Sequence, residues 1–265
     1  MYVDHTPQAK EFRARFRAYL ADLMTPEVRE TTRHAESGEV YRKVIRQFGR
    51  DGWLTPGWPV DYGGQGLDPL MQKILLEELI RAEAPFPFVT VNTVGPALIK
   101  LGSEEQKKAI LAPISRGDLI FAIGYSEPGA GTDLAALKTR AERDGDDFVI
   151  NGQKIFTSGA EGADYVFLAV RTDPEAPPHK GISILMVDTS LPGFSVSPIW
   201  TVGGFRTNVT YYDNVRVPAS MLIGPLNGGG ELVTEQLHHE RNGPAAMSYG
   251  AHLCFGMVVG WARTP

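Results

Sequence analysis

The sequence predicts an α+β protein in which helices come first, an antiparallel β-barrel follows, and a helix ends the chain. Two observations predict this order. Apolar residues recur at helical spacing through roughly the first hundred and twenty residues, and the helical pattern returns near residue 228. Between these parts, short alternating runs are separated by turn residues, as in antiparallel sheets. We therefore expect a helical domain at 1–120, a β domain at 121–227 and the start of another helical domain at 228–265.

Local signals place individual helices in the first part. Thr6-Pro7 is a cap followed by a first-turn proline, and it predicts a helix from there. Apolar residues at 44–48 predict a second helix, and those at 75–80 predict a third. Ser103 and Gln106 have the spacing of a capping box, which predicts a fourth helix over 104–115.

Strand signals dominate the second part. The pairs Asp144-Gly145 and Asn151-Gly152 are hairpin turns by composition, and both lie between alternating apolar runs. Further strand-like segments are expected at 165–170, 182–187, 194–198 and 209–217. The most apolar stretch, 245–262, is broken by three glycines and a histidine, which favours a buried helix over a membrane span.

Composition narrows the class of protein. The chain has 265 residues, of which 43% are hydrophobic and 22% charged, as in ordinary globular proteins. A net charge of -5 gives no electrostatic basis for binding nucleic acid or an anionic membrane. The single cysteine, Cys254, excludes an intramolecular disulfide and fits a reducing compartment. Since no secretory signal is visible, we expect a cytoplasmic protein.

The segment 124–133 reads GYSEPGAGTD and is the first candidate binding motif. Gly129 and Gly131 allow backbone conformations that present successive N–H groups, and Thr132 adds a hydroxyl. Such a loop binds an anion such as pyrophosphate without any lysine. Taken alone, the same residues are more typical of a common Pro-Gly turn. They do not form a nicotinamide fingerprint, because Leu134 occupies the place of its third glycine.

The segment 151–158 reads NGQKIFTS and is the second candidate motif. If its end is a strand, Phe156 and Ser158 point to the same face, since alternate side chains do so. An aromatic ring and a hydroxyl on one face suit a flavin ring and its N5 atom. Each residue alone is more typical of a core phenylalanine or of a surface serine.

Together the two motifs resemble those of the acyl-CoA dehydrogenase flavoproteins. In that family the first motif binds the pyrimidine edge of the flavin, and the second carries an aromatic residue and a hydroxyl beside N5. Five more segments are similar to the family, and they extend the resemblance over nearly the whole chain: 59–66, 77–78, 102–107, 203–208 and 212–218. The resemblance implies FAD as cofactor, bound by Ile123, Tyr125, Ser126, Thr132, Phe156, Thr157 and Ser158.

The resemblance also implies a catalytic base. Dehydrogenation of an acyl thioester needs a carboxylate that removes the α-proton. A subset of the family carries it as a glutamate directly before an arginine, which is the position of Glu240. An ion-paired surface glutamate is the alternative. By the same resemblance Thr132, His238 and Arg241 contact the substrate. The adjacent histidines are not a metal site, because neighbours on a helix point in different directions.

The reaction implied is FAD-dependent conversion of an acyl-CoA to its trans-2-enoyl-CoA, with electron-transfer flavoprotein as acceptor. The sequence is similar to actinobacterial acyl-CoA dehydrogenases that work as heterotetramers on steroid side-chain thioesters. We therefore expect a homo- or heterotetramer. Gly228-Gly-Gly230 departs from the asparagine–x–glycine–tryptophan pattern common at this junction.

The chain ends after the first helix of what resembles the C-terminal bundle, as in a fragment or in a chain completed by another polypeptide. Val258, Val259 and Trp261 would then form an exposed apolar face. Two alternative functions stay open: a non-catalytic structural subunit, and a flavin oxidase or monooxygenase on the same fold.

Overall fold

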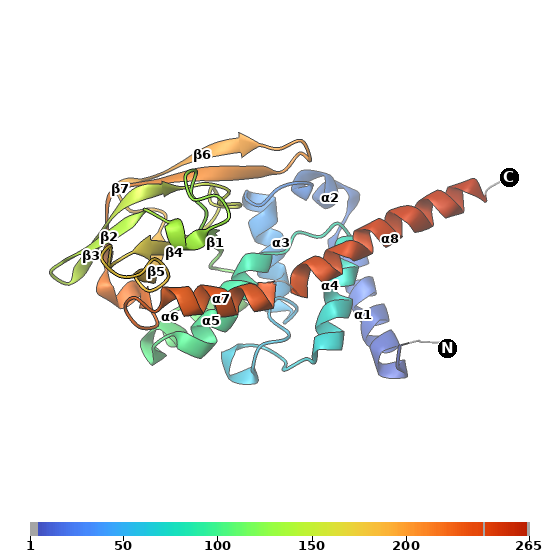
Figure 1. Cartoon of the computed structure of the whole chain (residues 1–265). Coiled ribbons are helices and arrows are strands. Elements are labelled where there is room, and N and C mark those ends of the chain that lie inside the picture. Colours follow the sequence, from blue (N-terminus) through green and yellow to red (C-terminus); the bar gives the residue numbers. More distant parts are fainter. Residues whose placement is uncertain (1–4, 241, 264–265) are drawn as a thin grey trace.

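The structure, a computed structural model, describes residues 5–240 and 242–263, without the side chains at 235, 237–240, 242–248 and 252. Helices lie on one side of the molecule and a β sheet on the other; of the last two helices, one lies beside the sheet and the other crosses the helical side and extends beyond it (Figure 1). The helices before the sheet are α1 (Pro7–Leu23), α2 (Pro26–Thr32), α3 (Glu39–Arg50), α4 (Pro69–Arg81), α5 (Gly95–Leu101) and α6 (Glu104–Ser115). This confirms the predicted α+β class.

Caps define the helices where the sequence predicted them. The Thr6 hydroxyl accepts a hydrogen bond from the Ala9 amide, and Pro7 occupies the first turn of α1. Ser103 and Gln106 form both bonds of the capping box that begins α6. The side-chain amide of Gln106 also donates to the carbonyls of Ser220 and Leu222, 2.7 and 2.8 Å away. The cap therefore joins α6 to the end of the sheet as well.

Two short helices, α2 and α5, were not anticipated from the sequence, nor was the π-helical segment Thr90–Val94 before α5. Segments of this length offer too few positions for a periodic pattern. Helix α4, which was predicted, carries an ion-pair network on its polar positions. The carboxylate of Glu78 is fully buried and accepts from Arg17 at 2.7 and 2.8 Å. Burial would raise the pKa of Glu78, but hydrogen bonds from Arg17 and Arg81 outweigh it and lower that pKa.

The sheet contains β1 (Phe121–Gly124), β2 (Arg140–Asp144), β3 (Asp147–Lys154), β4 (Tyr165–Arg171), β5 (Ile182–Asp188), β6 (Phe194–Trp200), β7 (Arg206–Pro218) and β8 (Leu222–Ile223). Its order is β6-β7-β3-β2-β4-β5-β8, with β1 beside β4. Most neighbours are antiparallel, as predicted, but β1 and β2 each run parallel to β4. Because β1 follows α6 instead of a hairpin, no local turn sets its direction.

The two expected hairpin turns differ in outcome. Asp144-Gly145 joins β2 to β3, and Gly145 has the positive φ that this turn needs. Asn151-Gly152 is not a turn, which corrects the prediction: the pair lies within β3 at a register shift against β7. Gly152 has φ 150°, and a Cβ there would lie 2.7 Å from the Thr139 Cα. A glycine in a strand interior marks a bulge as readily as a turn.

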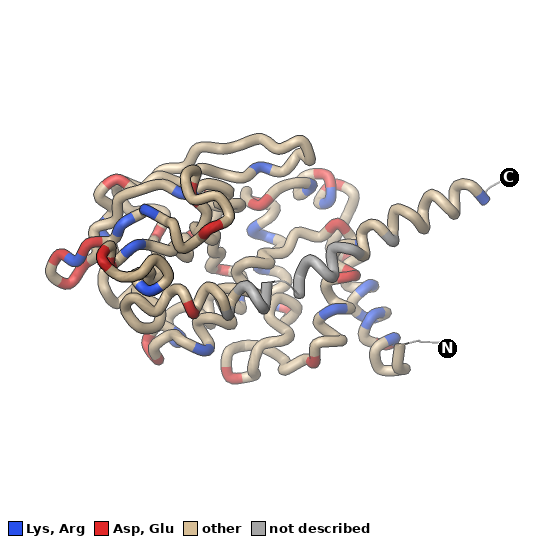
Figure 2. The backbone as a smooth tube through the Cα atoms, viewed as in Figure 1, with Lys and Arg blue, Asp and Glu red and all other residues tan. Residues whose placement is uncertain are grey.

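Helices α7 (Gly229–Glu240) and α8 (Asn242–Ala262) follow the sheet. The prediction that 245–262 is buried was wrong for the second half of α8, whereas the exposed apolar face expected at Val258 and Trp261 is confirmed. Phe255, Val258 and Trp261 are 70%, 60% and 79% exposed. This half extends beyond the body of the molecule, and it carries no charge before its end (Figure 2). Among the described residues, no helix is long and apolar enough to cross a bilayer.

Candidate functional site

The two candidate motifs lie side by side in the fold. The first follows β1 and continues as the loop 125–139, which we call the first loop. The second begins within β3, at residues 151–154, and continues as 155–162, the second loop. The Ile155 amide donates to the Ser126 carbonyl at 2.9 Å, and the Lys154 ammonium donates to the Tyr125 carbonyl at 3.2 Å. Two segments some thirty residues apart therefore form one structural unit.

A buried ion pair closes the first loop. The Lys154 ammonium lies 2.8 Å from Glu127 Oε1, and the lysine side chain has no solvent exposure. The same carboxylate accepts from the amides of Lys138 and Thr139 at 2.7 and 2.8 Å. Glu127 stands near the start of the loop and those amides near its end, so one carboxylate holds both ends together against β3.

The pair is charged at neutral pH. Burial lowers the pKa of Lys154 to about 8, although Glu127 acts in the opposite direction. Burial would raise the pKa of Glu127, but the ammonium and the Thr139 amide keep it below its usual value. Removing either partner would leave an uncompensated charge in the interior, which is strongly unfavourable.

The second loop is held to β7 by neutral hydrogen bonds of Thr157 and Ser158 and by an ion pair between Glu161 and Arg206. The Thr157 amide donates to the Asn208 backbone carbonyl, and the Asn208 side-chain amide donates back to the Thr157 carbonyl, both at 3.0 Å. The Ser158 hydroxyl donates to the Thr207 hydroxyl at 3.0 Å. Ser158 thereby keeps its oxygen lone pairs as acceptors.

Phe156 and Ser158 do not lie on a strand, which corrects the reason given from the sequence. Strand β3 ends at Lys154, and Phe156 has φ 61° in the left-handed region. Both side chains are nevertheless exposed, because Thr157 between them is buried against β7. A bulky residue in this backbone conformation is strained, and such strain concentrates at functional sites.

The tip of the first loop presents unused donors. Gly131 has φ 58°, and a Cβ on Gly129 or Gly131 would meet open space. Within the part of the chain that the structure describes, the amides of Gly129, Gly131 and Thr132 donate to no protein acceptor. Thr132 is exposed. These groups fit the anion-binding role expected of the loop.

Helix α7 contacts the first motif. The Tyr125 hydroxyl donates to the side-chain oxygen of Gln236, which is 3% exposed. Ile123 lies in β1, half-buried, and Ser126 is exposed just after it. The side chains of His238 and Glu240, and all of Arg241, lie outside the described residues, so their expected roles stay predictions.

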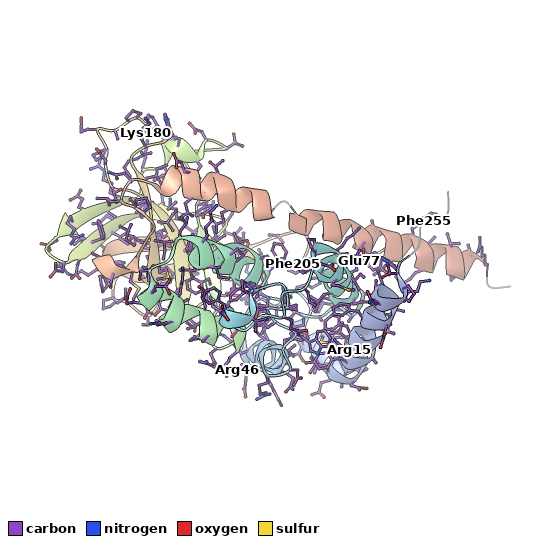
Figure 3. The ribbon with its side chains drawn as sticks, turned by 90° about the horizontal axis from the view of Figure 1, so that it is seen from below. Arg15, Arg46, Glu77, Lys180, Phe205 and Phe255 are labelled. Carbon is purple, nitrogen blue, oxygen red and sulfur yellow. The ribbon has the colours of Figure 1, made fainter. Side chains whose placement is uncertain are left out.

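A cavity of about 470 Å³ lies beside Ser158, between the second loop and the helices. Leu79, Ile80, Phe86 and Phe121 are among its apolar lining residues. Phe205 of the β6–β7 hairpin also lines it and contacts the ring of His34, with ring centroids 4.6 Å apart. Figure 3 shows Phe205 where the strands meet the helical side of the molecule.

Sequence reasoning missed four residues that organise this site: Glu127, Lys154, Asn208 and Gln236. Glu127 lies within the first motif, 124–133, and Lys154 lies within the second, 151–158. Lys154 is the last residue of an alternating strand. A lysine at the buried end of such a strand signals an ion pair, because a fully buried lysine requires a carboxylate partner. No local pattern identifies Asn208 or Gln236, since their partners are distant in the sequence.

The fold and the paired loops define the class of protein. Residues 6–118 match the model of the acyl-CoA dehydrogenase N-terminal domain, and residues 122–215 match that of the acyl-CoA dehydrogenase middle domain. The chain therefore belongs to the acyl-CoA dehydrogenase family, a family of oxidoreductases that are generally FAD-dependent.

Individual relatives are similar over most of the chain. Acyl-CoA dehydrogenase FadE26 of Mycobacterium tuberculosis is 52% identical over 91% of this chain and 62% of its own length. FadE29 of the same organism is 49% identical over 100% of this chain and 68% of its own length. The chain thus spans about two thirds of these relatives.

Solved structures agree with the fold. The Tcur3481-Tcur3483 steroid ACAD has a TM-score of 0.95 and 55% identity, over 99% of this chain and 69% of that chain. The ChsE4-ChsE5 complex from Mycobacterium tuberculosis has a TM-score of 0.85 and 53% identity, over 90% of this chain and 61% of that chain.

Proposed function

We propose that this chain takes part in the FAD-dependent dehydrogenation of an acyl-CoA to the trans-2-enoyl-CoA. The observation that carries the proposal is the joining of the two motif loops through Ser126 and Ile155, beside an apolar cavity. When bound, FAD supplies the two-electron oxidant that takes hydride from the β-carbon. The protein supplies binding, orientation and exclusion of water.

The residues present fit this cofactor. Free amides at Gly129, Gly131 and Thr132 would bind its phosphates. Ser126 and Ser158 would hydrogen-bond polar edges of the ring, and exposed Phe156 would pack against its plane. Ile123, Tyr125 and Thr157 would support them from the adjoining backbone.

Glu240 is the proposed base, which holds the proton taken from the α-carbon. Position 240 follows Gln236 by four residues on α7, and residues four apart share a helix face. Gln236 is bonded to Tyr125, so this face of α7 is directed toward the first motif. Thr132, His238 and Arg241 are proposed to contact the substrate.

The proposed substrate carries a bulky acyl group, since the cavity has the size of sites for drug-sized ligands. The steroid ACAD among the similar structures supports this substrate class. We further propose assembly as a homo- or heterotetramer in the cytoplasm, with electron-transfer flavoprotein as acceptor. The exposed apolar face of α8 and the two-component name of the ChsE4-ChsE5 complex support the assembly.

The test is anaerobic titration of the FAD-loaded protein with acyl-CoAs, alone and with a related chain. We expect bleaching of the flavin absorbance. Glu240→Gln should slow bleaching by about two to four orders of magnitude and leave binding of the acyl-CoA largely intact. Glu231→Gln, in the first turn of the same helix, is the matched control and should behave as wild type. A protein that binds no FAD would instead support the structural-subunit alternative.

A further inference from the structure

The cavity beside Ser158 is enclosed mostly by apolar residues and meets solvent along a more polar edge. Leu79 and Phe121 in its lining are 3% exposed, and Ile120 is 5% exposed. Among its described lining residues, four besides Ser158 are exposed. We call these four the rim: Arg33, His34, Glu83 and Phe205. A group that fills the cavity therefore lies in apolar surroundings until it reaches the rim.

Two contacts join the rim across three separate segments of the chain. The Arg33 guanidinium and the Glu83 carboxylate form an ion pair at 3.6 Å, which links the turn after α2 to the turn after α4. The rings of Phe205 and His34 meet edge to face at 85°, which links the β6–β7 turn to the same turn after α2. Because Arg33 and His34 are consecutive, the two contacts form one continuous band along the rim.

The backbone of the β6–β7 turn holds Phe205 at this position. The Thr201 amide and hydroxyl both donate to the Phe205 carbonyl, at 3.1 and 2.6 Å. Gly204 has φ 85°, and a Cβ there would lie 3.2 Å from Cδ2 of His34. The turn therefore lies directly against His34, beside α2 (Figure 1). Phe205 is 50% exposed, so its ring can be displaced without disturbing the core.

We propose that Phe205 and His34 limit how far the acyl group of the substrate extends, and thereby determine substrate specificity. This inference rests on the proposed function. Affinity rises by roughly fourfold for each methylene that an acyl group buries within an apolar cavity. An acyl group longer than the cavity must displace the Phe205 ring from His34. Loss of that aromatic contact lowers affinity by about two- to tenfold.

The charged part of the rim acts in the same direction. The side chains of Arg33 and Glu83 are 51% and 58% exposed, so they remain in contact with water. An apolar tail that passes them buries little further area and gains little affinity. The preferred acyl group is therefore bulky, apolar and short enough to end inside the cavity. Neither Phe205 nor His34 takes part in the chemical step.

The test uses ω-cyclohexylalkanoyl-CoAs whose terminal ring is moved outward two methylenes at a time. Calorimetric dissociation constants and kcat/KM for flavin reduction are measured for the FAD-loaded chain. In the wild type we expect affinity to rise with acyl length and to fall once the ring reaches the rim. Phe205→Ala should remove this fall and improve binding of the longest thioester, relative to the shortest, by about two- to tenfold. Phe205→Trp should move the fall to a shorter acyl group.

Val202→Ala is the matched control, because Val202 belongs to the same turn, is fully exposed and does not line the cavity. It should leave the dependence on acyl length unchanged. His34→Ala should act in the same direction as Phe205→Ala. The double variant should show less than the product of the two separate effects, since both changes remove one contact. Thermal unfolding of each variant detects a damaged fold, which would weaken binding by the same factor at every length.

The same dependence on acyl length in the wild type and in Phe205→Ala, or an equal change at every length, would overturn the inference. Failure of the proposed function has a different signature. Binding then shows the change caused by Phe205→Ala, but no thioester bleaches the flavin. A chain that binds no acyl-CoA of any length would overturn both.

Discussion

The first and second loops face the same site but are held differently, one by a buried ion pair and the other mainly by neutral contacts. The first loop is closed by the charged Lys154–Glu127 pair, in which the Lys154 side chain has no solvent exposure and Glu127 is 8% exposed. The second is held by neutral hydrogen bonds to β7, by the partly exposed Glu161–Arg206 ion pair, and by close packing, where Gly162 lies against Ser37. A buried charge pair stabilises only when it is complete, whereas neutral contacts are lost one at a time. The difference predicts a graded series of effects.

The largest effect is expected from Lys154→Met. The change leaves Glu127 buried without its cation, and we expect a loss of about 3–5 kcal/mol in the free energy of unfolding, measured with urea. FAD affinity should fall as well, since the first loop loses its closure. Lys154→Met with Glu127→Gln should recover part of the stability, because no uncompensated charge remains. A loss below about 1 kcal/mol in the single variant would contradict the charged closure.

Gly162→Ala should have an intermediate effect. A Cβ at this position would lie 2.4 Å from the Ser37 Cβ, so the second loop must move away from the 34–38 segment. We expect a loss of about 1–3 kcal/mol in thermal or urea unfolding. Adding Ser37→Gly removes the clashing carbon and should restore part of this loss. No recovery in the double variant would show that the contact is not the cause.

Asn208→Ala should lower the free energy of unfolding by less, about 1 kcal/mol. The Thr157 carbonyl loses the Asn208 side-chain donor but still accepts from the Ala160 amide at 3.3 Å. Hydrogen exchange at residues of the second loop should rise, and exchange in the first loop should not change. Equal increases in both loops would mean that they do not respond separately.

A dependence on alkaline pH is also expected, and only the charged closure produces it. In the folded protein the pKa of Lys154 is lowered to about 8. In the unfolded chain lysine titrates near ~10.4, so between these values the unfolded state binds more protons. The contribution of this group to the free energy of unfolding therefore rises with pH, by up to about 1 kcal/mol per unit.

The measurement is urea unfolding from about pH 8 to about pH 10. The difference in the free energy of unfolding between wild type and Lys154→Met should grow over this range. The difference between wild type and Asn208→Ala should stay constant. Buried Tyr41 and Tyr212, whose pKa values burial raises, affect all three proteins and cancel in the differences. If the difference between wild type and Lys154→Met did not change with pH, Lys154 would not titrate in this range.

Much of the fold could be predicted from the sequence, because its signals are local. The caps at Thr6 and Ser103 act within three residues of themselves, and the Asp144-Gly145 turn joins adjacent strands. Local signals failed where one pattern serves two structures. Asn151-Gly152 suits a turn and a bulge equally, and only pairing of β3 with β7 decides between them.

For the candidate site, the sequence by itself determined the family and the residue types of the two loops, since these are properties of contiguous segments. Only the tertiary structure decided that Lys154 is buried against Glu127, that Asn208 holds the second loop, and that His34 and Phe205 line one cavity. The apolar composition of α8 likewise did not determine its exposure. Burial and pairing depend on which distant segments meet, and that is set by packing of the whole chain and not by neighbours in the sequence.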